Sequence, residues 1–414
     1  MTVTQAQLDG YFKHVYADSL SDVVPDFAIL GKKIPFRRQD KIGKDYLFPV
    51  QLTRSHGYTW NGGLTAGNAF TLNPAISLEM QEANVTGSEF VLREKISYGA
   101  VSRSGGREES FGPVVDTVVM EMVNSAAFQR EMCLLYGGGN IGAVDAGGAA
   151  NPAFTISVAS WAAGLWAQME KAEIDCFTAA GVQQNVNAAL VVSAVDPVTR
   201  TITLTGNAAD LAAIVATDVF VPRGAQGNWF TGLDTILSNA GTLFGINAAT
   251  YSLWQGNTYD AAGAAMSVGK LQAAMTRATV RGLMEDVTVL VNTWTWTDLL
   301  NDLQALRRYA SDIRSEVETG SNSIKFYGMS GTMEIVPHPM VKAGEAFIVP
   351  LDQIYRIGST DLTFRLPDAG PDRFVRQLTD SAGFEVRCYF DQGIICRAPA
   401  KTVKISNILN ASGP

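Results

Sequence analysis

Three glycines in the stretch LYGGGNIGAV have the spacing of a phosphate-binding loop. Gly137, Gly139 and Gly142 match the pattern G-x-G-x-x-G, in which glycine lets the backbone approach the pyrophosphate of a dinucleotide. That chemistry requires a strand before the glycines and a helix after them. Here a long helical pattern precedes them and chain rich in Ala and Gly follows, so we interpret the glycines as a helix stop and a flexible turn.

Few other side chains could support catalysis or metal binding. The four cysteines form no C-x-x-C pair and are interpreted as buried thiols, and with only three histidines the chain lacks zinc-ligand spacing. His338 lies between two prolines and could act as a general base, but a structural histidine in a turn is the favoured interpretation. Glu316 and Glu318 share a face only if the chain is extended, and a solvated loop is the default interpretation. The sequence contains no P-loop, G-x-S-x-G or H-E-x-x-H motif, which predicts no catalytic, cofactor or metal site, although an enzyme built on carboxylates alone remains an alternative.

Composition and charge set limits on the class of protein. The chain has 414 residues, of which 47% are hydrophobic and 17% charged, and its formal net charge is -8. A protein that coats nucleic acid usually carries a basic stripe, so this charge argues against that class without excluding a surface that faces nucleic acid. The N-terminus lacks the apolar core of a signal peptide, and the uncharged run 235–259 is too polar to span a membrane. We expect a soluble protein made in the cytoplasm.

Residues 1–44 have the pattern of an extended arm. A short amphipathic turn is followed by chain punctuated by proline and by a cluster of basic side chains. Such a cluster could contact nucleic acid or an acidic neighbour, and a solvated or inter-subunit arm is the more ordinary interpretation. The basic residues expected to make arm contacts are Lys32, Lys33, Arg37 and Arg38.

Residues 45–105 are typical of a long β excursion. DYLFPVQLTR and EFVLREKISYGAVSRS are strand candidates on either side of a glycine-rich tip. The segment contains no compact apolar set that could support it, and an isolated two-stranded ribbon is marginal in water. We therefore expect it to lie on another surface, with a neighbouring subunit as the natural candidate.

The remaining segments alternate between helical and strand patterns. Apolar residues recur at helical spacing over 108–136, and a second helix is predicted over 160–177. Alternation with a period of two then predicts a small β-rich insertion over 181–228, with a hairpin in ALVVSAVDPVTRTITLTG. Helices and strands alternate over 229–375, including the buried strand VTVLVN, and alternating strands fill residues 376–414.

The order of these parts resembles the major capsid proteins of tailed bacteriophages, which have the Hong Kong 97 fold. The resemblance covers nearly the whole chain, from an arm through a β excursion and a long helix to a mixed α/β domain and closing strands. It implies an α+β fold with a β-hairpin E-loop and a small β-rich insertion. The implied parts are the N-terminal arm 1–44, the E-loop 45–105, the spine helix of the peripheral domain 106–137, the start of the axial domain 138–180, the insertion 181–228, the axial domain and return strands 229–375, and the peripheral-domain strands 376–414.

The resemblance implies a structural function that needs no cofactor. Copies of the chain would form pentamers and hexamers, which close into an icosahedral shell around packaged double-stranded DNA without sequence-specific binding and without a membrane. A scaffolding protein and a portal are expected partners, a decoration protein is a further one, and the virion would assemble in the host cytoplasm. The alternatives are an encapsulin-like compartment that encloses a cargo enzyme, and an unrecognised hydrolytic enzyme.

Neighbouring subunits are expected to meet at aromatic and basic side chains of these parts. The low charged content suits a chain whose faces are mostly subunit contacts, because charged residues are depleted at the centre of interfaces. The expected inter-subunit contacts are Tyr58, Trp60, Phe70, Arg93, Lys95, Arg103, Arg107, Trp254, Arg307 and Arg308.

Overall fold

The structure, a computed structural model, divides into two compact units. The smaller unit comprises Met1–Asp26, Val91–Ala126 and Phe364–Cys388, and the larger comprises Phe27–Phe90, Ala127–Thr363 and Tyr389–Pro414. Helices and strands mix along the chain, as the predicted α+β class requires. The structure describes residues 28–38, 46–61, 69–103, 114–148, 151–307, 324–328, 331–364, 375–379 and 381–413.

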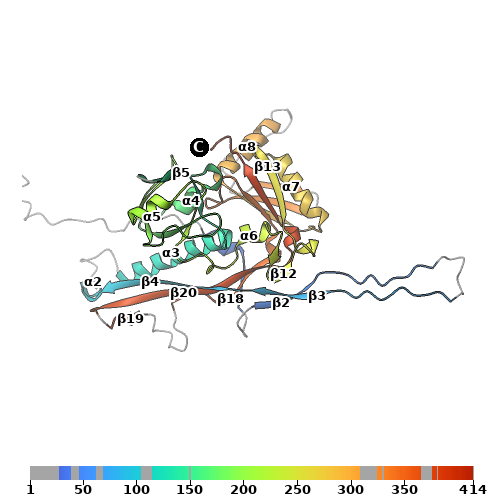
Figure 1. The fold of residues 1–414 in the computed structure, drawn as a ribbon, viewed down its shortest axis with the longest axis horizontal. Coiled ribbons are helices and arrows are strands. Elements are labelled where there is room, and N and C mark those ends of the chain that lie inside the picture. Colours follow the sequence, from blue (N-terminus) through green and yellow to red (C-terminus); the bar gives the residue numbers. More distant parts are fainter. Residues whose placement is uncertain are drawn as a thin grey trace, which may run out of the picture. The chain divides into compact units, whose positions relative to one another are not determined.

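A six-stranded sheet with two helices forms one part of the larger unit (Figure 1). Its central strand β14 (Val287–Val291) is buried at every position, because VTVLV is a continuous apolar run that suits a strand covered on both faces. Apolar side chains of α7 (Val268–Val280) pack into the same core. The strand predicted at VTVLVN is confirmed. The other elements of this part are β13 (Asn257–Ala264), α8 (Thr293–Arg307), β15 (Ile324–Gly328), β16 (Gly331–Pro337), β17 (Ala346–Val349) and β21 (Val403–Ile408).

Six strands close into a small barrel that shares a core with this sheet. Closure leaves no strand edge unpaired. The predicted hairpin is confirmed as β8 and β9, and three further barrel strands precede residue 181. The barrel strands are β5 (Gly142–Gly148), β6 (Asn151–Ile156), β7 (Glu173–Phe177), β8 (Leu190–Asp196), β9 (Thr201–Thr205) and β10 (Val219–Pro222).

The helix predicted over 160–177 is wrong. The segment instead contains the end of the short helix η3 (Val158–Ser160), then α4 (Ala163–Trp166) and β7. The aromatic side chains that suggested a helical face are buried, and Trp161 stacks on Trp166 with ring centroids 6.4 Å apart. The last five residues lie between β8 and β10 in the barrel, so pairing with distant strands decides their conformation.

The glycines of LYGGGNIGAV lie between a helix and a strand, which is the reverse of the order a dinucleotide site requires. α3 (Val114–Tyr136) ends directly before them, and β5 begins at Gly142. Gly138 has a φ of +78°, and a Cβ at Gly137 would lie 2.0 Å from the Phe230 carbonyl oxygen. The interpretation as a helix stop is confirmed, and the predicted first residues of this helix, 108–113, lie outside the described residues.

A second sheet contains the long strand β20 (Gly383–Cys396), which contributes residues to both units. In the larger unit, β18 (Ile354–Thr363) pairs antiparallel with β20, and β1 (Phe36–Arg38) pairs in parallel with β18. In the smaller unit, β19 (Val375–Gln377) pairs with the first residues of β20. The sheet also includes β4 (Ser88–Ser97), and the predicted C-terminal strands are confirmed as β20 and β21. Part of α3 and the helix α2 (Tyr98–Arg103) belong to the smaller unit.

The strands β2 (Tyr46–Gln51) and β3 (Met80–Val85) form a separate two-stranded ribbon in the larger unit (Figure 1). Their antiparallel register pairs the first residue of β2 with the last of β3. The first predicted strand of the excursion is confirmed as β2, but its partner is β3 and not the predicted return strand. The segment EFVLREKISYGAVSRS instead forms β4, which pairs with β20, and then the helix α2, so the prediction of one continuous return strand is wrong. The remaining short elements are α1 (Leu30–Lys33), α5 (Ala208–Ala213), α6 (Leu233–Leu237), β11 (Thr242–Leu243), β12 (Ile246–Asn247), η4 (Ser252–Trp254), η5 (Leu351–Gln353) and η6 (Pro399–Lys401).

Candidate assembly surface

Beyond its paired base, the ribbon continues as two limbs, residues 52–61 and 69–79, which hydrogen-bond to each other. Some of these bonds join backbone groups and others use threonine hydroxyls, so the limbs stay together without a regular ladder. The cross-limb bonds include Leu52 N to Glu79 O at 2.9 Å, His56 N to Ile76 O at 3.1 Å, and Asn73 N to Thr59 Oγ1 at 2.8 Å.

The ribbon exposes a long series of large apolar side chains. Trp60 is 89% exposed and lies edge-on to Tyr58, with ring centroids 6.4 Å apart. Extended apolar surface of this kind marks a binding site, because burying it is worth about 25 cal/mol per Å². The exposed large apolar residues on the ribbon are Leu47, Tyr58, Trp60, Phe70, Leu72, Ile76, Leu78 and Met80.

Polar and aromatic contacts fix the base of the ribbon on the larger unit. The Tyr251 hydroxyl donates to the Glu79 carboxylate and accepts from Gln81 Nε2 at 3.0 Å. The bond to Glu79 raises the pKa of Tyr251. The Phe48 ring packs against Trp254 with centroids 6.2 Å apart. The base of the ribbon, where the two limbs begin, is therefore fixed by contacts with residues 251 and 254.

Trp254, an expected inter-subunit contact, is a core residue of its own subunit. Its side chain is 1% exposed, and its indole Nε1 donates to Leu243 O at 2.9 Å. The expectation is wrong, because a buried indole cannot reach a neighbouring chain. An aromatic residue in an uncharged polar run suits an interface and a core equally well, so the sequence did not distinguish the two.

The other expected contact residues divide into exposed side chains and side chains outside the described part. The structure does not bring them together at one place, because they are spread over the ribbon, β1, β4 and α1. The exposed residues are Tyr58, Trp60, Phe70, Arg93, Lys95, Lys32, Lys33, Arg37 and Arg38. The side chains of Arg103 and Arg307, and all of Arg107 and Arg308, lie outside the described residues.

Two of the basic arm residues have defined partners within the larger unit. Lys33 Nζ lies 3.8 Å from a carboxylate oxygen of Glu334. The Arg37 guanidinium lies 4.3 Å from the ring centroid of Tyr355, a favourable cation–π distance. The structure thus places this part of the arm on the larger unit, while its contacts with other subunits stay a prediction.

A buried carboxylate holds the root of the arm. Leu30 and Ile34 of the α1 region are buried, so the chain enters the larger unit here. Glu131 of α3 is fully buried and accepts hydrogen bonds from the backbone N–H groups of Leu30 and Gly31, the latter at 2.8 Å. Charge-assisted bonds to backbone amides are strong, so this carboxylate fixes the start of α1.

His338 completes the contacts of Glu131. Its Nε2 lies 2.9 Å from the Glu131 carboxylate, and Met340 N donates to its Nδ1 at 3.2 Å. Because Nδ1 accepts from Met340 N, Nε2 is the ring nitrogen that faces the carboxylate as a donor. Both ring nitrogens are occupied and the side chain is fully buried, so the geometry supports the structural interpretation of His338 over a general base.

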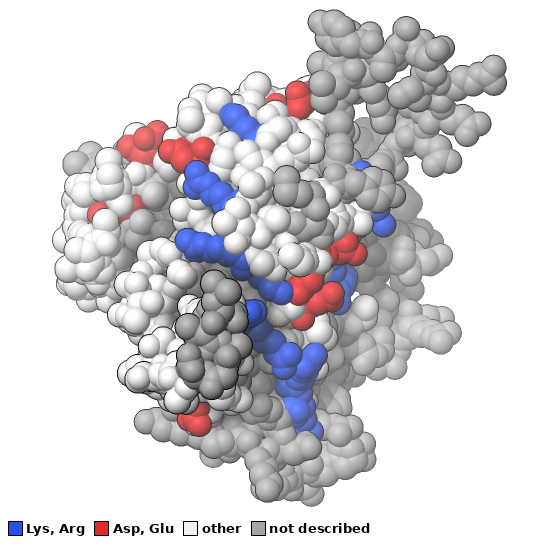
Figure 2. All heavy atoms as spheres, turned by 90° about the vertical axis from the view of Figure 1, so that its right-hand side faces the viewer, with Lys and Arg blue, Asp and Glu red and all other residues white. Residues whose placement is uncertain are grey.

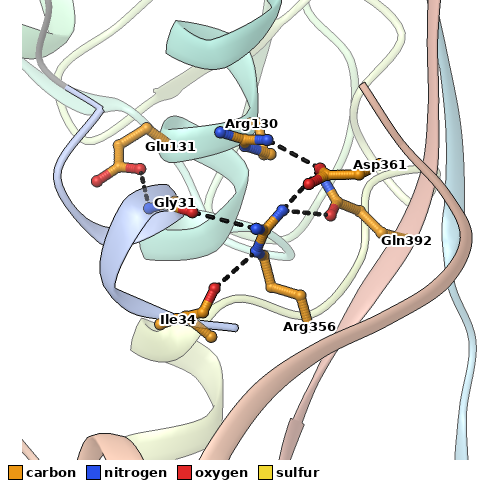
Figure 3. Close-up of polar contacts among 7 residues, drawn as sticks. All are labelled: Gly31, Ile34, Arg130, Glu131, Arg356, Asp361 and Gln392. Carbon is orange, nitrogen blue, oxygen red and sulfur yellow. Dashed lines mark hydrogen bonds and ion pairs between the residues drawn. The ribbon is translucent and has the colours of Figure 1, made fainter. Parts of the chain in front are cut away.

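Arg356 of β18 binds the carbonyl groups of the same short helix (Figure 3). Its Nε donates to Ile34 O and its Nη2 to Gly31 O, each at 3.1 Å. Its Nη1 donates to the Asp361 carboxylate at 2.7 Å, and Arg130 donates to the same oxygen at 2.9 Å. The Arg356 guanidinium therefore holds carbonyl groups at α1, and the Glu131 carboxylate holds amide groups of the same helix. We call Arg130, Glu131, His338, Arg356 and Asp361 the arm anchor.

The sequence analysis did not single out the arm anchor, apart from His338. The one available signal was the pair Arg130–Glu131, two charged residues between the apolar residues Phe128 and Met132 at the end of a long helical pattern. Charged side chains at such positions are rarely buried without partners. Their partners lie 100 or more residues away along the chain, which no local pattern reveals.

The described residues offer little for catalysis or metal binding. Within them, no group of three or more His, Cys, Asp or Glu side chains is placed to hold a metal ion. Burial raises the pKa of the Cys396 thiol to about 12 and also raises that of Cys176, which disfavours the reactive thiolate form. None of the described helices is long and apolar enough to cross a membrane.

Comparison with known proteins identifies the fold. No protein-family model matches the sequence, and no curated protein is significantly similar to it. The structure is similar to the capsid chain of cyanophage A-1(L), with a TM-score of 0.57 and 12% identity, over 99% of this chain and 100% of that one. The chain has the fold of a phage capsid protein. The resemblance to tailed-phage capsid proteins of the Hong Kong 97 fold is thereby confirmed at the level of the fold.

Two further solved structures agree with this assignment. The capsid chain of the native GTA particle matches with a TM-score of 0.50 and 9% identity, over 99% of both chains. The capsid chain of cyanophage P-SCSP1u matches with a TM-score of 0.50 and 10% identity, over 96% of this chain and 94% of that one. The similarity to capsid chains therefore extends over nearly the whole chain.

Proposed function

We propose that this chain is the major capsid protein of a tailed bacteriophage. Copies assemble as pentamers and hexamers that close into an icosahedral shell around the double-stranded DNA genome. The observation that carries the proposal is the similarity to a phage capsid chain over the full length of both chains. The exposed apolar ribbon supports it, because a ribbon of this length gains stability by lying on a second subunit.

We assign the parts of the chain by analogy with the capsid fold. The ribbon belongs to the E-loop, residues 45–105, and α3 belongs to the spine helix, residues 106–137. The six-stranded sheet belongs to the axial domain, proposed as 138–180 and 229–375, although its strand β21 comes from residues 376–414. The barrel combines β5, β6 and β7 from 138–180 with β8, β9 and β10 from the insertion proposed at 181–228. The arm, residues 1–44, and the strands of 376–414 complete the subunit.

In this proposal the contacts between subunits include both the ribbon and the arm. Tyr58, Trp60 and Phe70 pack on the neighbouring subunit through their exposed rings, and large aromatic residues are the usual energetic centres of interfaces. Lys32 and Arg38 are exposed beside the arm anchor and contribute basic contacts there. Arg93 and Lys95 play the same role on β4.

The proposed partners follow from the proposed shell. A separate scaffolding protein directs assembly in the host cytoplasm, a portal occupies one vertex, and a decoration protein is a further candidate. Packaged DNA is held by confinement, because a chain with a net charge of -8 is unsuited to tight binding of a polyanion.

The contents of purified particles test this function against the related compartment of the encapsulin type. Particles treated with nuclease should retain double-stranded DNA, which is released only when the shell is opened. Particles that contain a cargo enzyme and no DNA would contradict the phage assignment while leaving the shell intact.

A further inference from the structure

The two limbs of the ribbon carry two different sets of side chains on alternate positions. Residues 52–61 and 69–79 run side by side as extended chains (Figure 1). In an extended chain, successive side chains lie on opposite sides of the backbone, so odd and even positions separate. The odd positions hold only Thr, Ser, Gly, Asn, Ala and Glu, and every exposed large apolar residue of the limbs is at an even position.

Side chains at odd positions lie between the two limbs. The Thr59 hydroxyl accepts from Asn73 N at 2.8 Å, and Asn73 Nδ2 donates to Tyr58 O at 3.2 Å. Nearer the base, the Thr53 hydroxyl accepts from Glu79 N at 2.9 Å. Small polar side chains therefore join the limbs across the ribbon.

Gly57 shows that large side chains do not fit between the limbs. A Cβ at this odd position would lie 2.9 Å from Ala75 Cα on the opposite limb, so a side chain there would push the limbs apart. The even positions face away from the other limb, and Leu72 and Ile76 are accordingly 72% and 56% exposed. The ribbon thus has a polar inside and an apolar outside, the reverse of a folded domain. Figure 2 views the molecule from the side toward which the ribbon extends in Figure 1.

The outer edges of the two limbs differ in chemistry. On the limb 52–61, the outward positions begin with Arg54 and His56 and become aromatic only at Tyr58 and Trp60. On the limb 69–79, the outward positions are apolar along its length. We call this second set the apolar edge, which consists of Phe70, Leu72, Pro74, Ile76 and Leu78.

The exposed apolar area of the limbs is large enough to form one side of a stable interface. An aromatic side chain buries about 150–250 Å², and by this measure the apolar edge with the rings of Tyr58 and Trp60 offers roughly 800 Å² at its observed exposures. One partner buries about 800 Å² in a standard protein–protein contact, and the largest apolar patch of an ordinary monomer is about 300–600 Å². This area therefore indicates a protein partner.

Resting on the proposed shell function, we infer that a second copy of this chain covers the apolar edge along its whole length. The same copy covers the other limb only at Tyr58 and Trp60. Arg54 and His56 stay in water, because burying a polar or charged group without a partner costs free energy. Each copy carries one ribbon, and in a shell of identical subunits each ribbon meets the same surface of the next copy.

Thiol labelling tests which edge is covered. Ile76 and His56 lie directly across the ribbon, since His56 N donates to Ile76 O at 3.1 Å, and the four native cysteines are buried or half-buried. Ile76→Cys and His56→Cys should both react with a maleimide in the free subunit. In assembled shells, the labelling rate of Ile76→Cys should fall by about tenfold or more, because an interface residue reacts only when the contact opens, and that of His56→Cys should not change.

Paired serine variants give a second readout. Ile76→Ser with Leu78→Ser should raise the concentration needed for assembly by about tenfold or more, because apolar contact with the second copy is lost. Arg54→Ser with His56→Ser is the matched control on the other limb and should assemble normally. Both pairs are exposed, so the thermal melt of the subunit should stay unchanged.

Each outcome supports or overturns the inference. Equal labelling of the two thiols in shells would overturn it, as would normal assembly of the Ile76→Ser with Leu78→Ser variant. Protection of Ile76→Cys in the free subunit would mean that the ribbon folds on its own chain, and protection only after a different protein binds would assign the edge to that protein. Both results would also overturn the inference. Failure of the unmodified chain to assemble would count against the proposed function itself.

Discussion

At the root of the arm, one buried carboxylate organises two backbone amides and a histidine. Glu131 holds Leu30 and Gly31, and a Cβ on Gly31 would lie 2.7 Å from Arg130 Nη2. A larger residue at this position would therefore have to displace the Arg130 guanidinium. Specific polar contacts at this place fix the backbone of Leu30 and Gly31 on the larger unit.

Glu131→Gln should loosen this root. Glutamine keeps the size of the side chain but loses the charge that strengthens the bonds to Leu30 and Gly31, so the free energy of unfolding should fall by about 1–3 kcal/mol. Thermal melts measure this fall, and limited proteolysis should show new cleavage near residues 28–38. The exposed Glu170→Gln is the control and should change neither, and equal behaviour of the two variants would contradict the anchor.

At the scale of elements, the ribbon should matter for assembly and not for the fold of the subunit. Trp60→Ser with Phe70→Ser removes two exposed rings, so the thermal melt of the subunit should stay unchanged. Assembly should require about tenfold more protein or fail, because buried aromatic residues dominate interface energies. Met120→Ser removes an exposed apolar side chain of α3 as a control. Unimpaired shells from the ribbon variant would refute the assigned role.

Local patterns predicted the elements that form through local interactions. The continuous apolar run of β14, the hairpin of β8 and β9, and the end of α3 at the glycines all follow from signals within a few residues. The helix predicted over 160–177 was wrong because the last residues of this segment pair with β8 and β10. The strand β10 begins more than 40 residues later along the chain. The strand β5, GAVDAGG, has no apolar alternation, so closure of the barrel could not be foreseen.

The exposure of the ribbon was predictable because it depends on composition. A glycine-tipped excursion with exposed aromatic residues and no core of its own indicated a partner, and the ribbon side chains are indeed exposed. The arm anchor was not predictable, because Arg356 meets Ile34 from a strand 322 residues away in sequence. The burial of Trp254 was not predictable either, because it involves a residue far away in sequence. The Trp254 ring packs against Phe48 at the base of the ribbon.

At the scale of the whole molecule, a chain of low charged content suits the proposed shell. Charged residues make up 17% of the chain, which leaves apolar surfaces such as the exposed ribbon to supply the stability of the contacts. Because salt screens charged contacts and not apolar ones, raising the salt concentration should weaken finished shells only slightly.

Electron microscopy of the full chain, co-expressed with its scaffolding protein and purified by size exclusion, tests the central claim most directly. Closed shells or rings of five and six subunits, with the ribbon of each copy lying on its neighbour, are the predicted result. A monomer alone at high concentration, or oligomers in which the ribbon contacts no other copy, would contradict it.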